Sequence, residues 1–555
     1  MVRKQTPLDQ IADNWVEQLA KHSPSFATYI GSPVGADQLD NYSPEHEAEY
    51  QKIASQVRSQ IEATQPQDFA DEVTKDAMLS SLDLDNRLYD AGYFKRDLNN
   101  IASPSQSIRD VFDLSPVATE ADWENIAKRM NLVADSLSGY MQSLRLGIAD
   151  GQTPAKRQVD LIVEQADQIT AADGFFRTFA HGAKLEHAEL PESLKSDLGK
   201  AAEAATEGYA KFRQFLIEEL GPAASERDAV GREAYELLSE RFLGAKVDID
   251  ETYEWGKEEL LKMTREQEKV AQQIKPGASV KEAIEYLHQD PKRKLISTAE
   301  LQEWMQKLSD KAIEELGKTH FDIPEPMRKL ECLIAPTQHG GIYYTSPSDD
   351  FSRPGRMWWS VPAGVTEFDT WRETTTVYHE GVPGHHLQIA QAVFNREELN
   401  SWRRLASWSS GHGEGWALYA ERLMQELGYL DDPADQLGML DGQRMRAARV
   451  VLDIGVHLEK PRLDGTGKWD FDYALDFMAS NVNEELSFVK FEVNRYFGWA
   501  GQAPSYKIGQ RIWEQIRDDY KARKGHAFSI REFHKQALAL GGLGLDSLRR
   551  AMARI

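Results

Sequence analysis

The sequence predicts a large, mainly α-helical protein with a small β-sheet. Apolar residues recur at i, i+3, i+4 and i+7 through most of roughly the first 315 residues. Residues 320–366 are instead rich in Pro, Gly, Ser and aromatic residues, as loops and short strands are. The chain of 555 residues exceeds the size, about 250 to 300 residues, at which one core stops growing. We therefore expect two interlocked lobes with a cleft between them.

Residues 1–315 are expected to form an N-terminal lobe of stacked helices. Helical periodicity is clear over residues 8–22, 48–63, 123–146 and 301–317, with breaks at Gly or Pro. The alternation of polar and apolar residues that is typical of strands is nearly absent there. No repeat of fixed length is visible, which argues against a solenoid.

Residues 316–555 are expected to form the catalytic lobe. Two short β-like runs, ECLIA at 331–335 and GIYYT at 341–345, predict a small sheet near the active-site cleft. Helical periodicity then returns. Helices are predicted over residues 371–394, 413–427, 443–457, 472–496 and 507–524.

Composition and charge exclude several classes of protein. The 41% hydrophobic and 28% charged residues are typical of a globular protein. A formal net charge of -24 argues against nucleic acid or an anionic membrane as a partner. No apolar run has the length of a signal peptide core or a membrane span, so we predict a cytoplasmic location. The single cysteine, Cys332, leaves His and carboxylate as the ligands for any metal.

The segment TTTVYHEGVPGHHLQ contains the first candidate metal ligands. In the common zinc-peptidase motif two His ligands lie at i and i+4, and the Glu after the first His acts as general base. Here His379 is followed by Glu380, but the next histidine, His385, is six residues away. Six residues of regular helix advance about 600°, which points the second His away from the first. The interruption at Pro383–Gly384 must therefore bulge the helix if both histidines bind one ion.

A third ligand is expected from another helix. A catalytic zinc site has three protein ligands and an open position for water. The segment SSGHGEGWALYAERLMQELG offers Glu414 and Glu421, which lie seven residues apart and therefore on one helical face. One of them can bind the metal while the other orients a histidine ligand.

A third helix carries an ionic stripe. In GQRMRAARVVLDIGVHLEK, steps of three, four and four residues place Arg446, Arg449, Asp453 and His457 on one face. The surrounding residues are apolar, and charges among apolar side chains are costly unless they are paired or functional. The stripe is either a wall of the site that binds substrate or an internal ladder of salt bridges.

Three segments, HEGVPGHHLQ, GEGWALYAE and EVNRYFGWAGQAPSYKIGQ, resemble the bacterial family called domain of unknown function 885. The resemblance covers nearly the whole chain and is most specific over residues 321–506. That family is similar in its His/Glu motifs to the gluzincin metallopeptidases, which include aminopeptidase N, thimet oligopeptidase, angiotensin-converting enzyme and carboxypeptidase Taq. The resemblance implies a zincin-like fold of long helices with a deep cleft.

The resemblance also assigns ligands. GEGWALYAE aligns with the N-E-G-x-x-x-Y-x-E helix of aminopeptidase N-type enzymes, which implies Glu414 as the third zinc ligand and Glu421 as the residue that orients a ligand. HEGVPGH replaces H-E-x-x-H, so His386 remains the alternative to His385 as second ligand. If His385 is the ligand, His386 is expected to support the ligands from behind. Asp453 is a further candidate for this supporting role.

Other residues are candidates for the oxyanion and the substrate. Gluzincins commonly use a Tyr or His donor for the oxyanion, and His457, Tyr496 and Tyr506 are the candidates here. Arginines can fix a substrate carboxylate with paired hydrogen bonds. The predicted substrate contacts are Arg353 and Arg356 in the loop FSRPGRMWW, Arg449 and Tyr344, with Arg495 and Lys507 as further cations that could take this role.

We predict a zinc-dependent hydrolase with one zinc ion per chain, acting on a peptide or small amide. Two alternatives remain open. The chain could be a helical binding or scaffold protein with a structural or vestigial metal site, or a zinc hydrolase of esters or non-peptide amides. A general base beside the first His ligand favours an enzyme, because a structural site needs none. The sequence shows no self-association motif, and it does not fix the oligomeric state.

Overall fold

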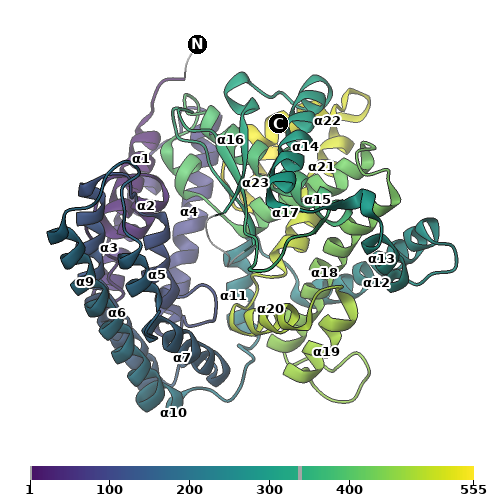
Figure 1. Cartoon of the computed structure of the whole chain (residues 1–555). Helices are drawn as coiled ribbons and strands as arrows, with labels where there is room; N and C mark the ends of the chain where they lie inside the picture. The colour runs from purple at the N-terminus through teal and green to yellow at the C-terminus, as the bar shows by residue number, and fades with distance from the viewer. Residues whose placement is uncertain (1–2, 336–340) are drawn as a thin grey trace.

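In a computed structural model, which describes residues 3–335 and 341–555, the protein is mainly helical with a small sheet, as predicted (Figure 1). The first helices lie together on one side of the molecule in Figure 1. They are α1 (Pro7–His22), α2 (Pro24–Tyr29), α3 (Pro44–Ala63), α4 (Phe69–Asp90), α5 (Pro104–Leu114), α6 (Glu120–Asp150), α7 (Lys156–Thr170), α8 (Phe175–His181), α9 (Glu192–Phe215) and α10 (Gly221–Ala223).

Local sequence signals set where several of these helices begin. The Thr6 hydroxyl accepts a hydrogen bond from the backbone N–H of Asp9, whose carboxylate accepts one from the N–H of Thr6. The same reciprocal arrangement opens α6 at Thr119 and Asp122. Such capping boxes satisfy N–H groups that a helix leaves unpaired at its start. Helix α6, with 31 residues, is the longest of these helices and packs along α9.

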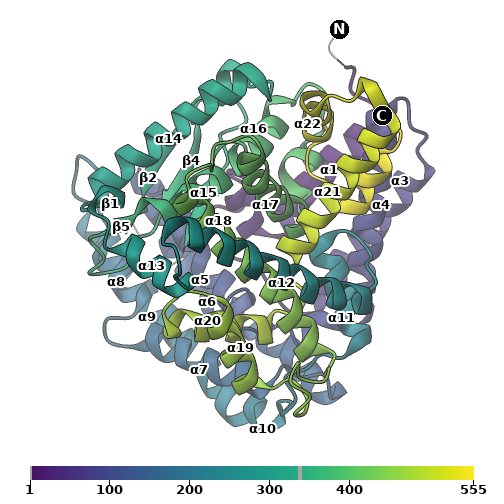
Figure 2. The same cartoon turned by 90° about the vertical axis from the view of Figure 1, so that its right-hand side faces the viewer.

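The next helices cross toward the rest of the chain. They are α11 (Arg232–Leu243), α12 (Ile249–Ile274), α13 (Val280–His288) and α14 (Thr298–Thr319). Figure 2 shows α12 running across the front of the molecule and α14 beside the sheet. Helix α12 packs along a helix of the C-terminal half, α18 (Pro433–His457), and Gly256 makes this approach close. A Cβ at Gly256 would lie 2.8 Å from a methyl carbon of Val450.

The sheet has three strands, and its central one was not predicted. Strand β4 (Gly355–Trp359) pairs in parallel with β2 (Leu330–Ile334) and antiparallel with β3 (Ile342–Thr345). A separate two-residue pair joins β1 (Lys294–Leu295) to β5 (Phe368–Asp369). The β-like runs at 331–335 and 341–345 are thus strands. Residues 336–340 between them lie outside the described residues.

Helices make up most of the remaining chain. They are α15 (Thr370–Glu380), α16 (His385–Phe394), α17 (Ser410–Glu426), α18, α19 (Phe471–Asn481), α20 (Leu486–Gly498), α21 (Ser505–Lys524), α22 (Ile530–Ala539) and α23 (Leu545–Met552). The single helix predicted over residues 472–496 is wrong, because it is divided into α19 and α20. Arg372 and Arg444 donate hydrogen bonds to the carbonyl oxygens of Asn483 and Ser480, so these groups are satisfied without a continuous helix.

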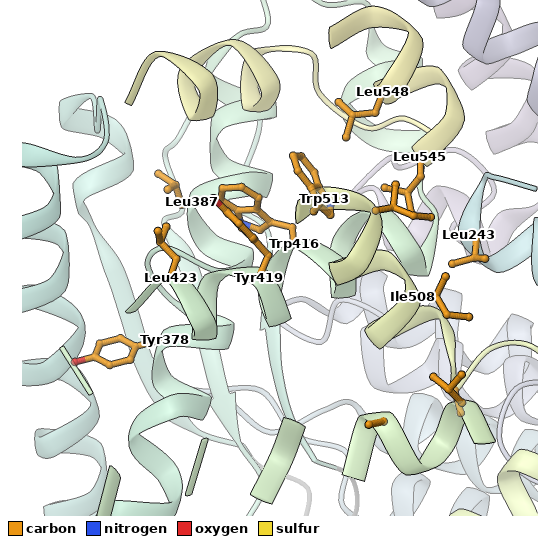
Figure 3. Packing of buried hydrophobic residues seen from close by; sticks show 14 of the residues in the cluster. Leu243, Tyr378, Leu387, Trp416, Tyr419, Leu423, Ile508, Trp513, Leu545 and Leu548 are labelled. Atoms are coloured by element: carbon orange, nitrogen blue, oxygen red, sulfur yellow. The ribbon is translucent and has the colours of Figure 1, made fainter. Parts of the chain in front are cut away.

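Two clusters of buried apolar side chains hold the fold together. The smaller lies within residues 98–220 and is built chiefly on α5, α6, α7 and α9. The larger combines α1, α3 and α4 with residues 235–552, and its aromatic centre is seen in Figure 3. The prediction that lobes meet near residue 315 stays a prediction. Side chains from both sides of that position share the larger cluster.

Candidate metal centre

The predicted interruption in the His379 helix is present. Residues 381–384 bulge out between α15 and α16, and the N–H of Gly384 donates to the carbonyl oxygen of Tyr378, 3.0 Å away and six residues earlier. A regular α-helix makes this bond to the fourth preceding residue, so the bulge takes up two residues. His385 therefore returns to the face of His379, and their ring centroids are 4.9 Å apart.

The bulge depends on a glycine and on a tryptophan from α17. A Cβ at Gly384 would lie 1.8 Å from the carbonyl oxygen of His379, which leaves space for glycine alone. The indole N–H of Trp416 donates to the carbonyl oxygens of Pro383, at 2.8 Å, and Gly384, at 3.2 Å. Trp416 is fully buried, 5.0 Å from Trp513 between ring centroids (Figure 3). The core of the protein thus fixes the loop that brings the two histidines together.

The bulge brings three potential ligands to one point. The Nε2 atoms of His379 and His385 lie 3.3 and 3.5 Å from Oε2 of Glu414, and the ligand atoms of all three residues lie within 4.8 Å of one another. Among the described residues, this Glu414 oxygen is buried without a hydrogen-bond partner. Ligands about 2.0–2.1 Å from a tetrahedral zinc ion are about 3.3 Å apart. Both the donor types and their spacing fit a zinc ion.

Glu421 holds His379 from behind. One carboxylate oxygen accepts a hydrogen bond from His379 Nδ1 at 2.8 Å, and the other accepts from the amide of Gln443 at 3.0 Å. With one proton on Nδ1, His379 turns Nε2 toward Glu414, where a metal ion would take the place of a second proton. Burial lowers the pKa of His379, but the carboxylates of Glu414 and Glu421 outweigh it and raise the pKa to about 10. A carboxylate behind a histidine is the usual support of a zinc ligand.

Glu380 has the environment expected of a proton carrier. Its side chain is buried, and one carboxylate oxygen has no hydrogen-bond partner among the described residues. Burial raises the pKa of Glu380, whereas the neighbouring His385 and His379 act in the opposite direction. A carboxylate that is buried and unpaired accepts a proton more readily than one in water.

His386 lies outside the cluster. Its Nε2 donates to the carbonyl oxygen of Met327 at 2.8 Å, and its Nδ1 accepts from the hydroxyl of Tyr344 at 3.0 Å. Burial lowers the pKa of His386 to about 4. Both ring nitrogens are thus occupied by neighbours at the sheet, and the geometry favours His385 as second ligand. Tyr344, predicted to contact substrate, here anchors α16 to β3.

The predicted substrate arginines of the aromatic loop are paired within the protein. Arg353 donates to the carbonyl oxygen of Ser346 at 2.8 Å. Arg356 is not in a loop but on β4, opposite Glu331 in the strand register, and donates to that carboxylate at 2.8 Å. Glu331 thus provides a counterion for Arg356, whereas the contact of Arg353 is one hydrogen bond to a backbone carbonyl.

The second half of α20 and the middle of α18 share a buried ionic network. Arg449 donates to the hydroxyl of Tyr496 and to Glu492, both at 2.7 Å, and Arg495 donates to Glu492 at 3.0 Å. The Tyr496 hydroxyl donates to Glu492 at 2.5 Å. Burial raises the pKa of Tyr496, and Glu492 adds to this effect. The hydrogen of this hydroxyl is directed to Glu492 rather than to the candidate ligands.

Asp453 and His457 complete the stripe of α18 but face other neighbours. Asp453 accepts from the hydroxyl of Tyr235 at 2.7 Å and from the N–H of Gly501 at 2.9 Å. Nε2 of His457 bonds to the carbonyl oxygen of Tyr496 at 2.9 Å. Both side chains are fully buried. Their contacts join α11, α18 and α20 and leave Nε2 of His457 no hydrogen for an oxyanion.

Tyr506 is the predicted oxyanion donor whose hydroxyl remains available. Among the described residues, it has no hydrogen-bond partner, and Arg449 lies 5.3 Å from its ring centroid. Burial raises the pKa of Tyr506, and the negative charge of Glu414 raises it further. A neutral phenol near Glu414 is suited to donate a hydrogen bond.

Two polar residues, Gln443 and Lys507, support the site from behind and were not predicted in this role from the sequence. Gln443 connects Glu421 to Lys507, whose ammonium donates to the Gln443 carbonyl at 2.7 Å and lies 3.1 Å from Glu259. Burial lowers the pKa of Lys507 to about 8. The available signal was the spacing of Gln443, three residues before Arg446 on the ionic face of an otherwise apolar helix.

The fold and site together define a mainly helical protein with one cluster, among its described residues, of three His and carboxylate side chains that could hold a metal. The chain belongs to the family described as bacterial protein of unknown function (DUF885), which residues 24–552 match. No curated protein matches the sequence.

Two solved structures share the fold. The protein called a "putative lipoprotein" from Colwellia psychrerythraea has 21% sequence identity and a TM-score of 0.85 over 99% of this chain and 98% of its own. A "putative lipoprotein of unknown function" from Shewanella oneidensis has 15% identity and a TM-score of 0.75 over 99% and 100% of the two chains. At this identity the likeness concerns the fold alone. None of the helices in the described part of the chain combines the length and apolar character that a membrane crossing requires.

Proposed function

We propose that the protein is a zinc-dependent hydrolase that cleaves peptides, with His379, His385 and Glu414 as zinc ligands. The observation that carries the proposal is the convergence of their three ligand atoms beside the buried carboxylate of Glu380. The bulge at residues 381–384 explains how an HE-x4-H spacing serves the role of H-E-x-x-H. This accounts for the departure from the gluzincin pattern and supports that resemblance.

The residues divide the work of hydrolysis among them. A zinc ion held by His379, His385 and Glu414 would supply a Lewis acid for the substrate carbonyl and for the attacking water. Glu380 accepts the proton of the attacking water at its unpaired oxygen and passes it to the leaving amine. Tyr506 donates a hydrogen bond to the carbonyl oxygen as negative charge develops there. Glu421 keeps His379 in the tautomer that presents Nε2 to the metal.

The ligand count supports an enzyme over a structural metal site. Structural zinc is usually enclosed by four protein ligands, whereas catalytic zinc keeps a position open. The cluster in the described residues has three members, and Glu380 lies buried beside them without a full set of hydrogen bonds. Burying a carboxylate that lacks hydrogen bonds destabilises the fold, and a scaffold protein would gain no function from it.

The relatives bear on location only by name. Both solved structures are called lipoproteins, and that description belongs to those proteins. The cytoplasmic location of this chain stays a prediction. Catalysis by the cluster depends on neither location.

The first test measures zinc and turnover in matched variants. We expect about one zinc ion per chain in the wild type, and loss of zinc in the His379→Ala/Glu414→Ala double variant. Glu380→Gln should keep the zinc and lose about 10²- to 10⁴-fold in peptide hydrolysis, because the general base is removed while the ligands remain. Elemental analysis and a peptide library read by mass spectrometry provide the two measurements.

Each alternative predicts a different result. Zinc that is retained by the double variant would refute the ligand set. Bound zinc with full activity in Glu380→Gln would refute the base. Zinc without hydrolysis of any peptide, ester or amide would favour the scaffold, and hydrolysis of esters alone would restrict the enzyme to that class.

A further inference from the structure

Arg446 lies on the face of α18 that is turned toward the candidate site. Three residues before it, Gln443 bonds to Glu421, and three residues after it, Arg449 lies beside the ring of Tyr506. Residues three apart on a helix are neighbours on its surface. Arg446 is therefore placed between the carboxylate that supports His379 and the candidate oxyanion donor.

Its guanidinium has no partner within the described part of the chain. Arg446 is half-buried, its Nε is enclosed, and it makes no hydrogen bond or ion pair with any described residue. The neighbouring cations differ in this respect. Arg449 and Arg495 are paired with Glu492, and Lys507 with Glu259. Only the Nε atom is enclosed, so the terminal nitrogens of the guanidinium remain accessible and can pair with an external anion.

The carboxylates around the site already have other contacts. Glu421 is bound to His379 and Gln443, and Glu380 lies next to His379 in sequence, beside the candidate ligands. None of the ion pairs between described residues joins either carboxylate to Arg446. The guanidinium of Arg446 is therefore free to pair with an anion that enters the site.

We propose that Arg446 binds the free C-terminal carboxylate of the peptide whose scissile bond lies at the metal cluster, so that the enzyme releases residues from the C-terminal end of its substrates. The inference rests on the proposed hydrolase function. A guanidinium matches a carboxylate with two parallel hydrogen bonds, which gives both affinity and orientation. Of the two arginines that the sequence suggested for this role, Arg356 is paired with Glu331 and Arg353 bonds to the carbonyl oxygen of Ser346, both in the sheet region.

The carboxylate could also belong to an acidic side chain near the scissile bond. A free C-terminus and an aspartate or glutamate side chain present the same group to Arg446. A binding experiment with three peptides of one sequence separates them: the free acid, the C-terminal amide, and an amide whose last residue is replaced by glutamate.

The binding experiment uses the Glu380→Gln variant, whose hydrolysis is expected to be slow enough for binding to be measured. Calorimetry with one equivalent of added zinc compares this parent with Glu380→Gln/Arg446→Met. We expect the parent to bind the free acid about 10- to 100-fold more tightly than either amide, as the loss of a charged hydrogen-bonding partner implies. The methionine variant should bind all three peptides equally weakly. Arg446→Lys, which keeps the charge but not the paired geometry, should retain part of the preference.

Arg265 provides the matched control. It is an exposed arginine on α12, and Arg265→Met should leave the preference unchanged. A preference as large as the parent's in the Arg446 variants, or equal binding of acid and amide by the parent, would overturn the inference. Tight binding of the glutamate amide would assign Arg446 to acidic side chains instead. An Arg446-dependent preference in a protein whose wild type hydrolyses no peptide would refute the proposed function alone.

Discussion

Glu421 is the residue on which the chemical state of His379 depends. It contacts the Nδ1 side of the imidazole at 2.8 Å and is itself held by Gln443, so a buried polar chain stands behind one candidate ligand. Burial alone would raise the pKa of Glu421, but His379 and Arg446 outweigh it and keep the carboxylate ionised. An ionised partner makes the imidazole a stronger electron donor to a metal.

Glu421→Gln should weaken zinc binding by about 10- to 100-fold, the usual effect of losing a partner behind a ligand. The amide keeps the size of the side chain but loses its charge, and it brings a second amide against Gln443. Titration of zinc against a competing chelator measures the affinity. Glu426→Gln is the control, since Glu426 is exposed at the end of the same helix. Equal affinities in both variants would exclude Glu421 from the metal centre.

Single-residue predictions from sequence succeeded where the partner was close along a helix. The spacing of Glu414 and Glu421 places both on one face, and the structure brings both to His379. Arg356 could not be assigned in this way. Its partner, Glu331, lies opposite it only because two strands 25 residues apart in sequence pair in parallel.

At the scale of elements, the bulge between α15 and α16 is the feature that makes the cluster. It converts a spacing that a regular helix would place on different faces into one that brings two rings to 4.9 Å between centroids. The bulge has no space for a side chain at Gly384, because the backbone there lies against the carbonyl oxygen of His379.

Gly384→Ala should therefore damage both the fold and the site. The added methyl group would force the bulge open, at a cost of about 1–3 kcal/mol in the free energy of unfolding, and should reduce zinc content. Denaturant unfolding and elemental analysis provide the readings. Gly199→Ala, in the exposed middle of α9 where a Cβ meets no atom within 4 Å, should instead stabilise by about 0.5–1 kcal/mol. A Gly384→Ala protein with normal stability and zinc would show that the bulge does not need glycine.

Elements were predictable where periodicity was strong and unpredictable where tertiary contacts decide. The helices around His379, Glu414 and Arg449 follow their apolar spacing. Strand β4 was missed because GRMWW follows Pro354 and opens with Gly and Arg, as a loop would, although Met357 and Trp359 are buried and Trp358 between them is not. The break between α19 and α20 depends on arginines from distant helices, which the local sequence cannot reveal.

At the scale of the whole molecule, the C-terminal helices support the centre from behind. His534 on α22 accepts a hydrogen bond from the hydroxyl of Tyr419 at 2.8 Å, and its ring lies 5.6 Å from that of Trp416, between centroids. Trp416 in turn holds the bulge. The larger core cluster thus extends from the bulge at residues 381–384 to the C-terminal helices. This continuity could not be inferred from the sequence, because no pattern links segments more than 100 residues apart.

This packing has a consequence for stability against pH. Burial, together with the positive charges of Arg517 and His320, lowers the pKa of His534 to about 3. In the unfolded chain a histidine titrates near pH 6.5, so between pH 6.5 and pH 3 the unfolded state binds the extra proton. The contribution of His534 to stability is therefore complete above about pH 6.5 and is lost progressively as the pH falls.

Replacing His534 by glutamine should remove this pH-dependent share. Glutamine can still accept a hydrogen bond from Tyr419 but does not titrate. Acidification from pH 7 to pH 5 should therefore lower the free energy of unfolding of the variant by about 2 kcal/mol less than that of the wild type. Urea unfolding at both pH values gives the two differences. His187→Gln is the control, because His187 is exposed and should leave the difference unchanged. A variant that loses as much stability on acidification as the wild type would show that His534 takes up its proton in the folded state, and that the support behind the bulge is open to water.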